Sequence, residues 1–186
     1  GVLIGAMDYE ALLAEGNAGF AALHPADEWD AISLNYTSGT TGDPKGVVYH
    51  HRGSYLMSFG TVAAWQLGQH PTYLYTVPMF HCNGWGHAWT MALMAAKIVL
   101  TRTITAEEIF RLIDRHKVTH FGGAPIVLGM LVNAPDEQRP NFSDRTVRAM
   151  TAGAPPPASI LEKLSSMGVE VMQVYGLTET YGHVTQ

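Results

Sequence analysis

The stretch that decides the fold is Ala31-Ile32-Ser33-Leu34-Asn35-Tyr36 followed by Thr37-Ser38-Gly39-Thr40-Thr41-Gly42-Asp43-Pro44-Lys45-Gly46. The first six residues are typical of a strand, and the next ten contain four hydroxyl side chains, three glycines and one lysine. Glycine lets consecutive backbone N–H groups gather around an anion, and hydroxyls and a lysine complete such a site. The pattern predicts a polyphosphate-binding loop, with a flexible Gly/Ser/Thr surface loop as the alternative.

Residues 37–46, here called the phosphate-loop run, lack the P-loop spacing Gly-x-x-x-x-Gly-Lys-Ser/Thr. A Walker-type NTPase is therefore disfavoured. The run instead resembles the phosphate-loop signature of adenylate-forming enzymes, the family of acyl-CoA synthetases, luciferases and peptide-synthetase adenylation domains. The resemblance implies a catalytic Lys45 and ATP contacts from Thr37, Ser38, Gly39, Thr40, Thr41, Gly42 and Lys45.

Strand-like and helix-like segments alternate from Ala31 onward, which predicts an α/β layer with a largely parallel sheet and flanking helices. The expected strands are 31–36, 47–50, 73–77, 97–101, 118–121, 147–150 and 169–174. The expected helices are 7–16, 54–67, 84–95, one after the Thr105 cap, 126–133 and 158–167. Ligands bind outside the carboxyl ends of parallel strands, so the loops that follow these strands are expected to share one crevice.

A second motif, Tyr175-Gly176-Leu177-Thr178-Glu179, combines an aromatic ring, a flexible turn, a hydroxyl and a carboxylate. Taken alone it is an ordinary turn after a strand, but it resembles the second nucleotide motif of the same family. The resemblance implies that Thr178 contacts phosphate, Glu179 supports Mg²⁺ and Tyr175 lies along adenine. It also places Gln173, Val174 and Gly176 in the ATP pocket, and it makes Thr178 and Glu179 catalytic.

Three further segments match the family pattern. Gly153-Ala154-Pro155 resembles the element between adenine and the acyl group, which implies ATP contacts from Gly153 and Ala154 and acyl contacts from all three residues. His81 and Trp85 resemble the segment that lines the acyl tunnel, and His81 matches a gating, catalytic position. Arg102 resembles a position that meets the CoA phosphates. The Cys82–His81 pair is disfavoured as a nucleophile, because neighbours in extended chain point apart.

Composition narrows the function classes. The 186 residues are 47% hydrophobic and 15% charged, which suits a packed core, and no apolar run reaches the ~18 residues of a membrane span. The net charge is −5, with seven acids and no Lys or Arg before Lys45, so a basic surface for nucleic acid is not expected. One cysteine excludes an internal disulfide framework and fits a cytoplasmic location. No positively charged region precedes Val2-Leu3-Ile4, so no secretory signal is expected.

The resemblance covers about Tyr9 to Gln186 and is nearest to short- or medium-chain acyl-CoA synthetases, including methylmercaptopropionate-CoA ligase-like members. It implies that the protein uses ATP and CoA as co-substrates and Mg²⁺ as a cofactor, and that its other substrate is a small-molecule carboxylic acid. A homodimer is left open. We expect residues 1–30 to form an acidic lead-in and 31–186 the nucleotide- and acyl-binding core. Because Tyr-x-Thr-Gly-Asp and the small C-terminal domain are missing, we expect a central fragment with little or no activity by itself.

Three alternatives stay open at this point. Instead of an acyl-CoA synthetase, the sequence also allows a nucleotide-binding module without catalysis, a phosphotransferase that uses the same loop, or an adenylating enzyme with a different acceptor. The products separate them: carboxylate-dependent AMP and pyrophosphate indicate adenylation, and ADP indicates phosphotransfer. Saturable binding without a product indicates a module.

Overall fold

A five-stranded parallel sheet forms the centre of the molecule in the computed structural model, which describes residues 7–37, 42–140, 142 and 144–186. The strand order is β4-β3-β5-β6-β7, and every pairing is parallel. The bounds are β3 (Thr72–Tyr75), β4 (Lys97–Leu100), β5 (His120–Gly122), β6 (Val147–Thr151) and β7 (Val169–Gln173). The predicted α/β fold with a largely parallel sheet is confirmed.

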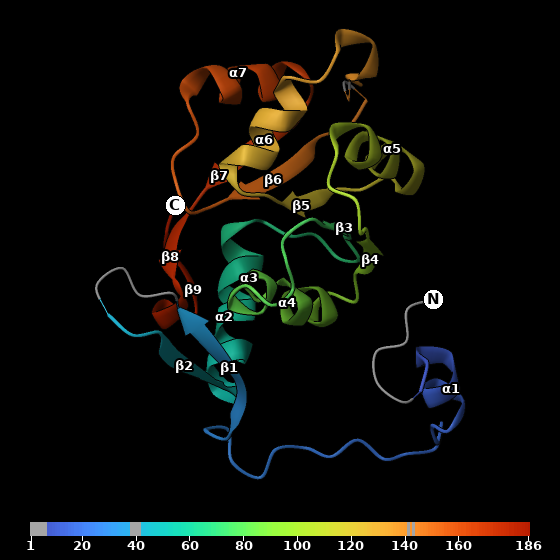
Figure 1. Cartoon of the computed structure of the whole chain (residues 1–186), viewed down its shortest axis with the longest axis vertical. Helices are drawn as coiled ribbons and strands as arrows, with labels where there is room; N and C mark the ends of the chain where they lie inside the picture. Colours follow the sequence, from blue (N-terminus) through green and yellow to red (C-terminus); the bar gives the residue numbers. More distant parts are fainter. Residues whose placement is uncertain (1–6, 38–41, 141, 143) are drawn as a thin grey trace.

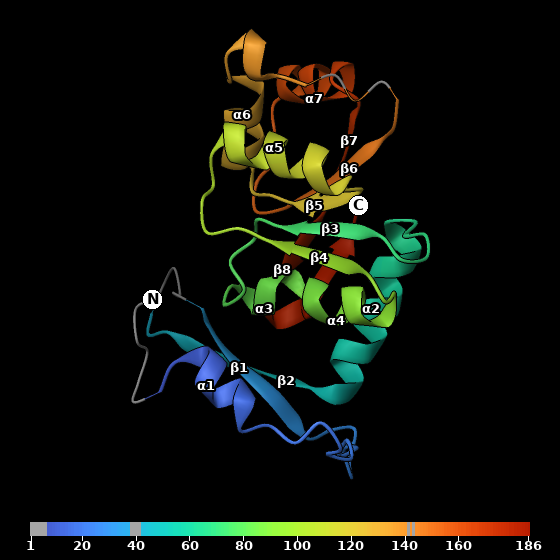
Figure 2. The same ribbon diagram turned by 90° about the vertical axis from the view of Figure 1, so that its right-hand side faces the viewer.

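Helices cover both faces of this sheet, as Figures 1 and 2 show. One face carries α5 (Ala106–His116), α6 (Pro125–Val132) and α7 (Ala158–Ser166), and the other carries α2 (His51–Ala64), α3 (Cys82–Trp85) and α4 (His87–Leu93). Alternate residues of one strand serve opposite cores: Leu74 packs on the α5–α7 side, and Tyr73 and Tyr75 pack on the α2–α4 side. The sheet is therefore buried on both faces.

Local sequence signals set the helix ends. The Thr105 side chain accepts a hydrogen bond from the Glu108 N–H at the start of α5, and the predicted apolar face of that helix is buried. Pro125 occupies the first turn of α6, where its missing N–H costs nothing. A 3₁₀ turn, η1 (Asp136–Gln138), follows α6.

The predicted strand 31–36 does not join the parallel sheet. β1 (Ala31–Thr37) and β2 (Lys45–His50) form a separate antiparallel ribbon, so the phosphate-loop run joins two antiparallel strands. The expectation that this run follows a parallel strand is therefore wrong. The physical reason is that β2 begins after a seven-residue connection, which is too short for the crossover that parallel strands need.

The second motif also differs from expectation, because its first half is a strand. β8 (Tyr175–Leu177) pairs antiparallel with β9 (Gly182–Thr185) through the 3₁₀ turn η2 (Thr178–Thr180). Tyr181 and Gly182, with φ of 70° and 155°, let the chain reverse there. A second difference lies at 84–95, where the regular right-handed helix is only α4 (His87–Leu93). The segment labelled α3 (Cys82–Trp85) before it is a left-handed turn, because its residues have positive φ.

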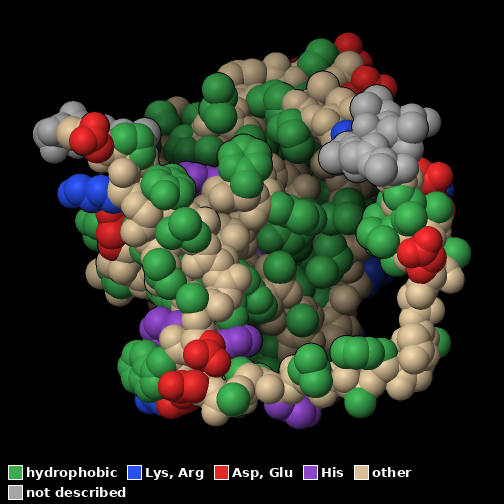
Figure 3. Space-filling model, turned by 60° about the horizontal axis from the view of Figure 1, so that its bottom comes forward, with side chains coloured by type: hydrophobic (Ala, Val, Ile, Leu, Met, Phe, Trp, Pro, Cys, Tyr) green, Lys and Arg blue, Asp and Glu red, His purple; other side chains and the backbone are tan. Residues whose placement is uncertain are grey.

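The lead-in contacts little of this body. Every described residue from Met7 to Asp30 is exposed, and α1 (Tyr9–Ala14) buries no side chain. In Figure 3 this part of the chain forms a narrow arm along the lower and right-hand edge of the molecule. Of the helices in the described part of the chain, none has the length and apolar character to cross a bilayer.

Candidate functional site

A cavity of about 580 Å³ lies at the carboxyl ends of the parallel strands. It receives residues from the segments that follow β3, β4, β5, β6 and β7, and from the β8–β9 hairpin. Strands of a parallel sheet end at one edge, which is why segments separated by up to about a hundred residues meet there. The predicted convergence of loops thus holds for those after the third, fifth, sixth and last expected strands.

The cavity wall is mainly apolar, with a few polar groups. Its apolar part includes Val77, Trp85, Ile126, Met150 and Leu177, and its polar groups include His81, Cys82, Thr178 and His183. Burial lowers the pKa of His183, which keeps the ring neutral near pH 7. An apolar cleft with convergent polar groups suits a small organic ligand, since the apolar wall supplies affinity and the polar groups orient it.

One side of the cavity is built by a left-handed turn, Cys82–Gly86. All five residues have positive φ, between 44° and 70°. For a residue other than glycine this backbone costs roughly 1–2 kcal/mol, so neighbouring groups must hold it. The Tyr75 hydroxyl donates to the Gly84 carbonyl over 3.1 Å, and a Cβ on Gly84 would meet that phenol. The turn gives the cavity Cys82 and Trp85.

The β1–β2 ribbon is joined to the second motif through two tyrosines. The Tyr49 hydroxyl donates to the Thr178 carbonyl over 2.8 Å, and its ring stacks on Tyr181 with centroids 3.8 Å apart. The Tyr181 hydroxyl in turn donates to the His50 carbonyl over 2.7 Å. Burial, with Cys82, Tyr181 and Glu179 adding to it, raises the pKa of Tyr49, so its phenol remains a donor. These contacts place β2 next to the second motif.

Six of the predicted site residues line the cavity: His81, Trp85, Gly153, Val174, Gly176 and Thr178. Thr178 is held from two sides, since its hydroxyl lies 3.0 Å from the Cys82 sulfur and its carbonyl accepts from Tyr49. The structure therefore brings residues of the acyl segment, the Gly-Ala-Pro element and the second motif to one cavity.

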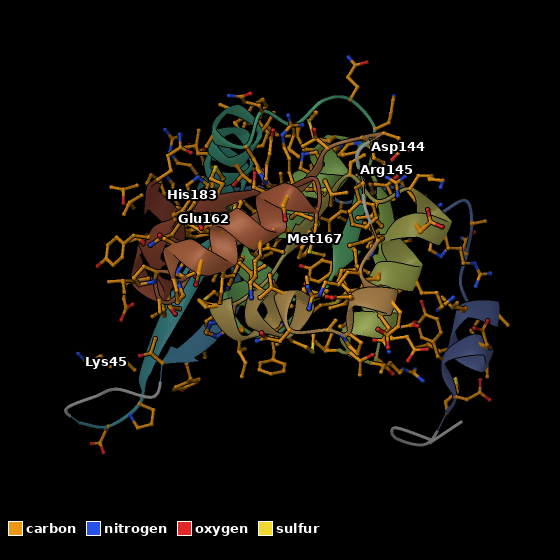
Figure 4. All side chains as sticks on the ribbon, turned by 90° about the horizontal axis from the view of Figure 1, so that it is seen from above. Lys45, Asp144, Arg145, Glu162, Met167 and His183 are labelled. Carbon is orange, nitrogen blue, oxygen red and sulfur yellow. The ribbon has the colours of Figure 1, made fainter. Side chains whose placement is uncertain are left out.

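The other predicted residues lie outside the lining of this cavity. Lys45 is exposed at the start of β2 and points away from the body in Figure 4, about 13 Å along the strand from Tyr49. Glu179 is exposed beside Thr178, and Arg102 is exposed after β4. Also outside the lining are Thr37, Gly42, Ala154, Pro155, Gln173 and Tyr175. Ser38, Gly39, Thr40 and Thr41 fall outside the described residues.

Several lining residues were missed by sequence reasoning. Cys82, Tyr181 and His183 line the cavity, as do Ile104 and Ile126. Tyr181 and His183 directly follow the second motif, so a tight turn at Gly182 was the available signal for them. No sequence signal was available for the two isoleucines, because a single apolar residue near a loop looks the same in the sequence whether it faces a ligand or the core.

The donor set next to Thr178 fits a magnesium ion that is shared with a ligand. Among the described residues, no group of three or more His, Cys, Asp or Glu gathers as a metal site. Glu179 offers an exposed carboxylate and Thr178 a hydroxyl. Mg²⁺ keeps several waters and commonly takes one or two carboxylates together with substrate phosphates, so these oxygens suit it.

Comparison with known proteins gives a consistent result. A family model described as AMP-binding enzyme matches residues 5–186. The acetate/butyrate–CoA ligase AAE7, peroxisomal, of Arabidopsis thaliana is 47% identical over 181 residues, which are 97% of this chain and 32% of that protein. The chain thus spans about a third of that relative's length.

Two solved structures share the fold. The inhibitor-bound N-terminal domain of FACL13 from Mycobacterium tuberculosis has a TM-score of 0.83 at 26% identity, over 93% of this chain and 44% of that one. O-succinylbenzoate coenzyme A synthetase from Bacillus subtilis, in complex with ATP and magnesium ion, has a TM-score of 0.76 at 25% identity, over 85% of this chain and 32% of that one. Because the family model covers nearly the whole sequence, this chain belongs to the AMP-binding enzyme family.

Proposed function

We propose that this chain is the nucleotide- and acyl-binding core of an ATP-dependent acid–thiol ligase. Such an enzyme joins a carboxylate to the α-phosphate of ATP with release of pyrophosphate, and the thiol of CoA then displaces AMP to form a thioester. The observation that carries the proposal is the single cavity that receives Thr178, Gly153 and His81. Family membership and the ligase relative support it.

Charge neutralisation and alignment are the main tasks of the protein in the first step, because the carboxylate and the phosphates repel one another. We assign Lys45 and the amides of the phosphate-loop run to the phosphates, and the Thr178 hydroxyl to a phosphate oxygen. Bound Mg²⁺ would supply further positive charge beside Glu179. Lys45 lies outside the cavity lining, so its role requires the Lys45 side chain to come closer to the ligand when ATP binds.

The acid is proposed to be short-chain and aliphatic. The cavity wall offers Val77, Trp85, Ile126 and Met150 to an alkyl group, and His81 stands at its edge with an exposed side chain. The relative that acts on acetate and butyrate, by its name, supports a short chain.

The remaining proposals concern the CoA site, the division of the chain, the location and the oligomeric state. We assign the CoA phosphates to Arg102, and we divide the chain into a lead-in (1–30) and a core (31–186), which the exposure of residues 7–30 supports. A cytoplasmic enzyme remains our proposal, with the peroxisome as the alternative named by the relative. A homodimer also remains a proposal.

The test is Lys45→Ala in a longer protein that contains this chain together with the rest of the ligase. A charge-assisted hydrogen bond contributes roughly 1.5–3 kcal/mol, so we expect a tenfold to hundredfold loss of acid-dependent pyrophosphate release. Lys163→Ala is the matched control, because Lys163 is exposed on α7. Unchanged pyrophosphate release in Lys45→Ala would refute the assignment of Lys45.

The same assay separates the alternative functions. ADP as the nucleotide product would indicate a phosphotransferase, and saturable ATP binding without a product would indicate a binding module. AMP and pyrophosphate without a CoA thioester would indicate a different acceptor. For the 186-residue chain alone we expect little or no turnover, and repeated cycles of ATP/pyrophosphate exchange would contradict that.

A further inference from the structure

Asn83 sits in the middle of the left-handed turn that forms one side of the cavity. Its φ and ψ are 44° and 49°, and Asn is one of the few residues that tolerate this conformation. Cys82 precedes it and Trp85 follows it by two positions, and both line the cavity. Any rotation of the backbone at Asn83 would therefore move two parts of the cavity wall.

The turn is tied to β1 by a reciprocal pair of asparagines. The Asn83 backbone N–H donates to Asn35 Oδ1 over 3.2 Å, and Asn35 Nδ2 donates to Asn83 Oδ1 over 2.9 Å. Since a backbone N–H can only donate, the first bond fixes which way the Asn35 amide faces, and the second bond follows from it. Ser33 Oγ donates to the same Asn83 oxygen over 2.5 Å.

Asn35 is 5% exposed, so its amide depends on protein partners rather than on water. Its neighbours Leu34 and Tyr36 are exposed, which leaves Asn35 as the one buried side chain among the described residues of β1. A buried amide in a strand whose other side chains are half-buried or exposed adds little hydrophobic stabilisation. The structure gives it a specific task instead, which is to hold Asn83.

The far side of the turn reaches the second motif. The Cys82 sulfur lies 3.0 Å from the Thr178 hydroxyl. The turn thus connects β1, which leads into the phosphate-loop run, with Thr178, and it does so through two adjacent residues. A displacement of β1 would reach the cavity by this route.

We propose that Asn83, held by Asn35, is a positioning residue that sets the wall of the cavity and links it to the β1–β2 ribbon. Asn83 acts through Cys82 and Trp85 and does not itself line the cavity. The effect on catalysis rests on the proposed function, whereas the effect on the turn does not. Each can therefore be measured separately.

The first experiment uses the reactivity of Cys82, the only cysteine of the 186-residue chain, with a neutral maleimide. Asn83→Gly keeps a residue that adopts positive φ and removes the side-chain oxygen, and Asn83→Asp keeps an oxygen acceptor for Ser33 and Asn35. We expect Asn83→Gly to raise the labelling rate roughly tenfold, the factor expected when about one hydrogen bond of net stabilisation is lost. Asn83→Asp should label no faster than the original chain.

Two more variants complete the set. Asn35→Ala removes both Asn35–Asn83 bonds and should raise the rate at least as much as Asn83→Gly, which removes only the bond between the two side chains. The double variant should raise it by less than the product of the two effects, because that side-chain bond is lost in both single variants. Asn17→Gly is the matched control: Asn17 lies in the exposed lead-in and its side chain accepts from the Gly19 N–H. If Asn83→Gly does not fold, Asn35→Ala decides. An unchanged labelling rate in Asn35→Ala, or fast labelling in Asn83→Asp, would overturn the proposal.

The second experiment measures steady-state kinetics of the longer ligase with the same variants. We expect Asn83→Gly to raise the KM for the acid about tenfold with less than a twofold change in kcat, and Asn83→Asp to restore it. A general loss of structure would lower kcat by reducing the active fraction, so the split between KM and kcat separates the two. Equal losses in both would contradict positioning. If the original ligase releases no pyrophosphate, the proposed function fails while the labelling result still stands.

Discussion

The parallel sheet and the β1–β2 ribbon differ in what holds them together. In the sheet, Tyr73, Phe121 and Ala149 are fully buried between two layers of helices. In the ribbon, Asn35 and Tyr49 are the only buried side chains among its described residues, while Tyr36 and Val48 are more than half exposed. The sheet is therefore stabilised by apolar burial, and the ribbon is fixed by a few directional hydrogen bonds.

This difference shows how the fold separates stability from site geometry. Hydrophobic burial is non-directional and large, so the sheet can provide a rigid frame. Hydrogen bonds contribute little each and depend on angle and distance, so Tyr49 and Asn35 can locate the ribbon without anchoring it strongly. A segment held in this way can respond to a ligand. The predictions below test that contrast, in order of expected effect.

The largest effect is expected from truncating the sheet core. Phe121→Ala should lower the free energy of unfolding by about 3–5 kcal/mol, because it leaves a cavity on the central strand β5. Urea unfolding followed by circular dichroism measures it. Phe80→Ala makes the same chemical change at a side chain that is 84% exposed, and it should alter stability by less than about 0.5 kcal/mol. Similar losses in the two variants would break the contrast.

The second largest effect is expected when acid lowers the stability of the core between the sheet and helices α2–α4, where His87 is buried. Burial, with smaller contributions from His183 and His120, lowers the pKa of His87 from 6.5 to about 3. The Tyr73 hydroxyl lies 2.6 Å from His87 Nδ1, and burial raises the pKa of that phenol, so the phenol donates to a neutral ring. In the unfolded chain His87 binds a proton below about pH 6.5, whereas in the folded chain it binds one only below about pH 3. This stabilisation is therefore complete above pH 6.5 and is lost progressively as the pH falls.

At pH 5 the loss from His87 should be about 2 kcal/mol, measured as the amount by which His87→Gln reduces the change in unfolding free energy between pH 7 and pH 5. The lowered pKa of His120 leaves a smaller pH dependence in that variant. The matched control is His24→Gln, in the exposed lead-in. If His87→Gln keeps the full slope, the acid sensitivity does not come from His87. His120, whose pKa burial lowers to about 4, is then the next residue to test.

The smallest effect on stability is expected in the ribbon. Tyr49→Phe removes the donor to the Thr178 carbonyl and should cost about 1 kcal/mol in urea unfolding. Tyr9→Phe is the control, because Tyr9 is 70% exposed on α1. A loss as large as that of Phe121→Ala would show that the ribbon is part of the core, and would remove the basis for treating it as a weakly held segment.

Much of the fold follows from local pattern. The Thr105 cap and the apolar face of α5 were predictable because they depend on residues three or four apart in one helix. The short connection after β1 makes an antiparallel pairing with β2 predictable. That this ribbon and the β8–β9 hairpin stay outside the parallel sheet depends on which strand edges remain free after the sheet forms, and no local signal contains that information.

The same division applies to the candidate site. His81, Trp85, Gly153 and Thr178 were predicted from short motifs, and the structure places all four in the lining of one cavity. His183 and Ile126 were not found, because they enter the wall through the hairpin turn and the start of α6. The left-handed turn was missed because a run of positive φ is unfavourable on local grounds and exists only where Asn35 and Tyr75 hold it.

The sequence by itself determined the alternation of strands and helices, the family, and the residue types of its short motifs, since these depend on identity and spacing along the chain. Tertiary structure alone decided that β1 and β2 leave the sheet and that Cys82 meets Thr178. It also decided that Lys45 stands outside the cavity. Contacts between residues tens of positions apart are set by how whole layers pack, and that balance is summed over the entire molecule.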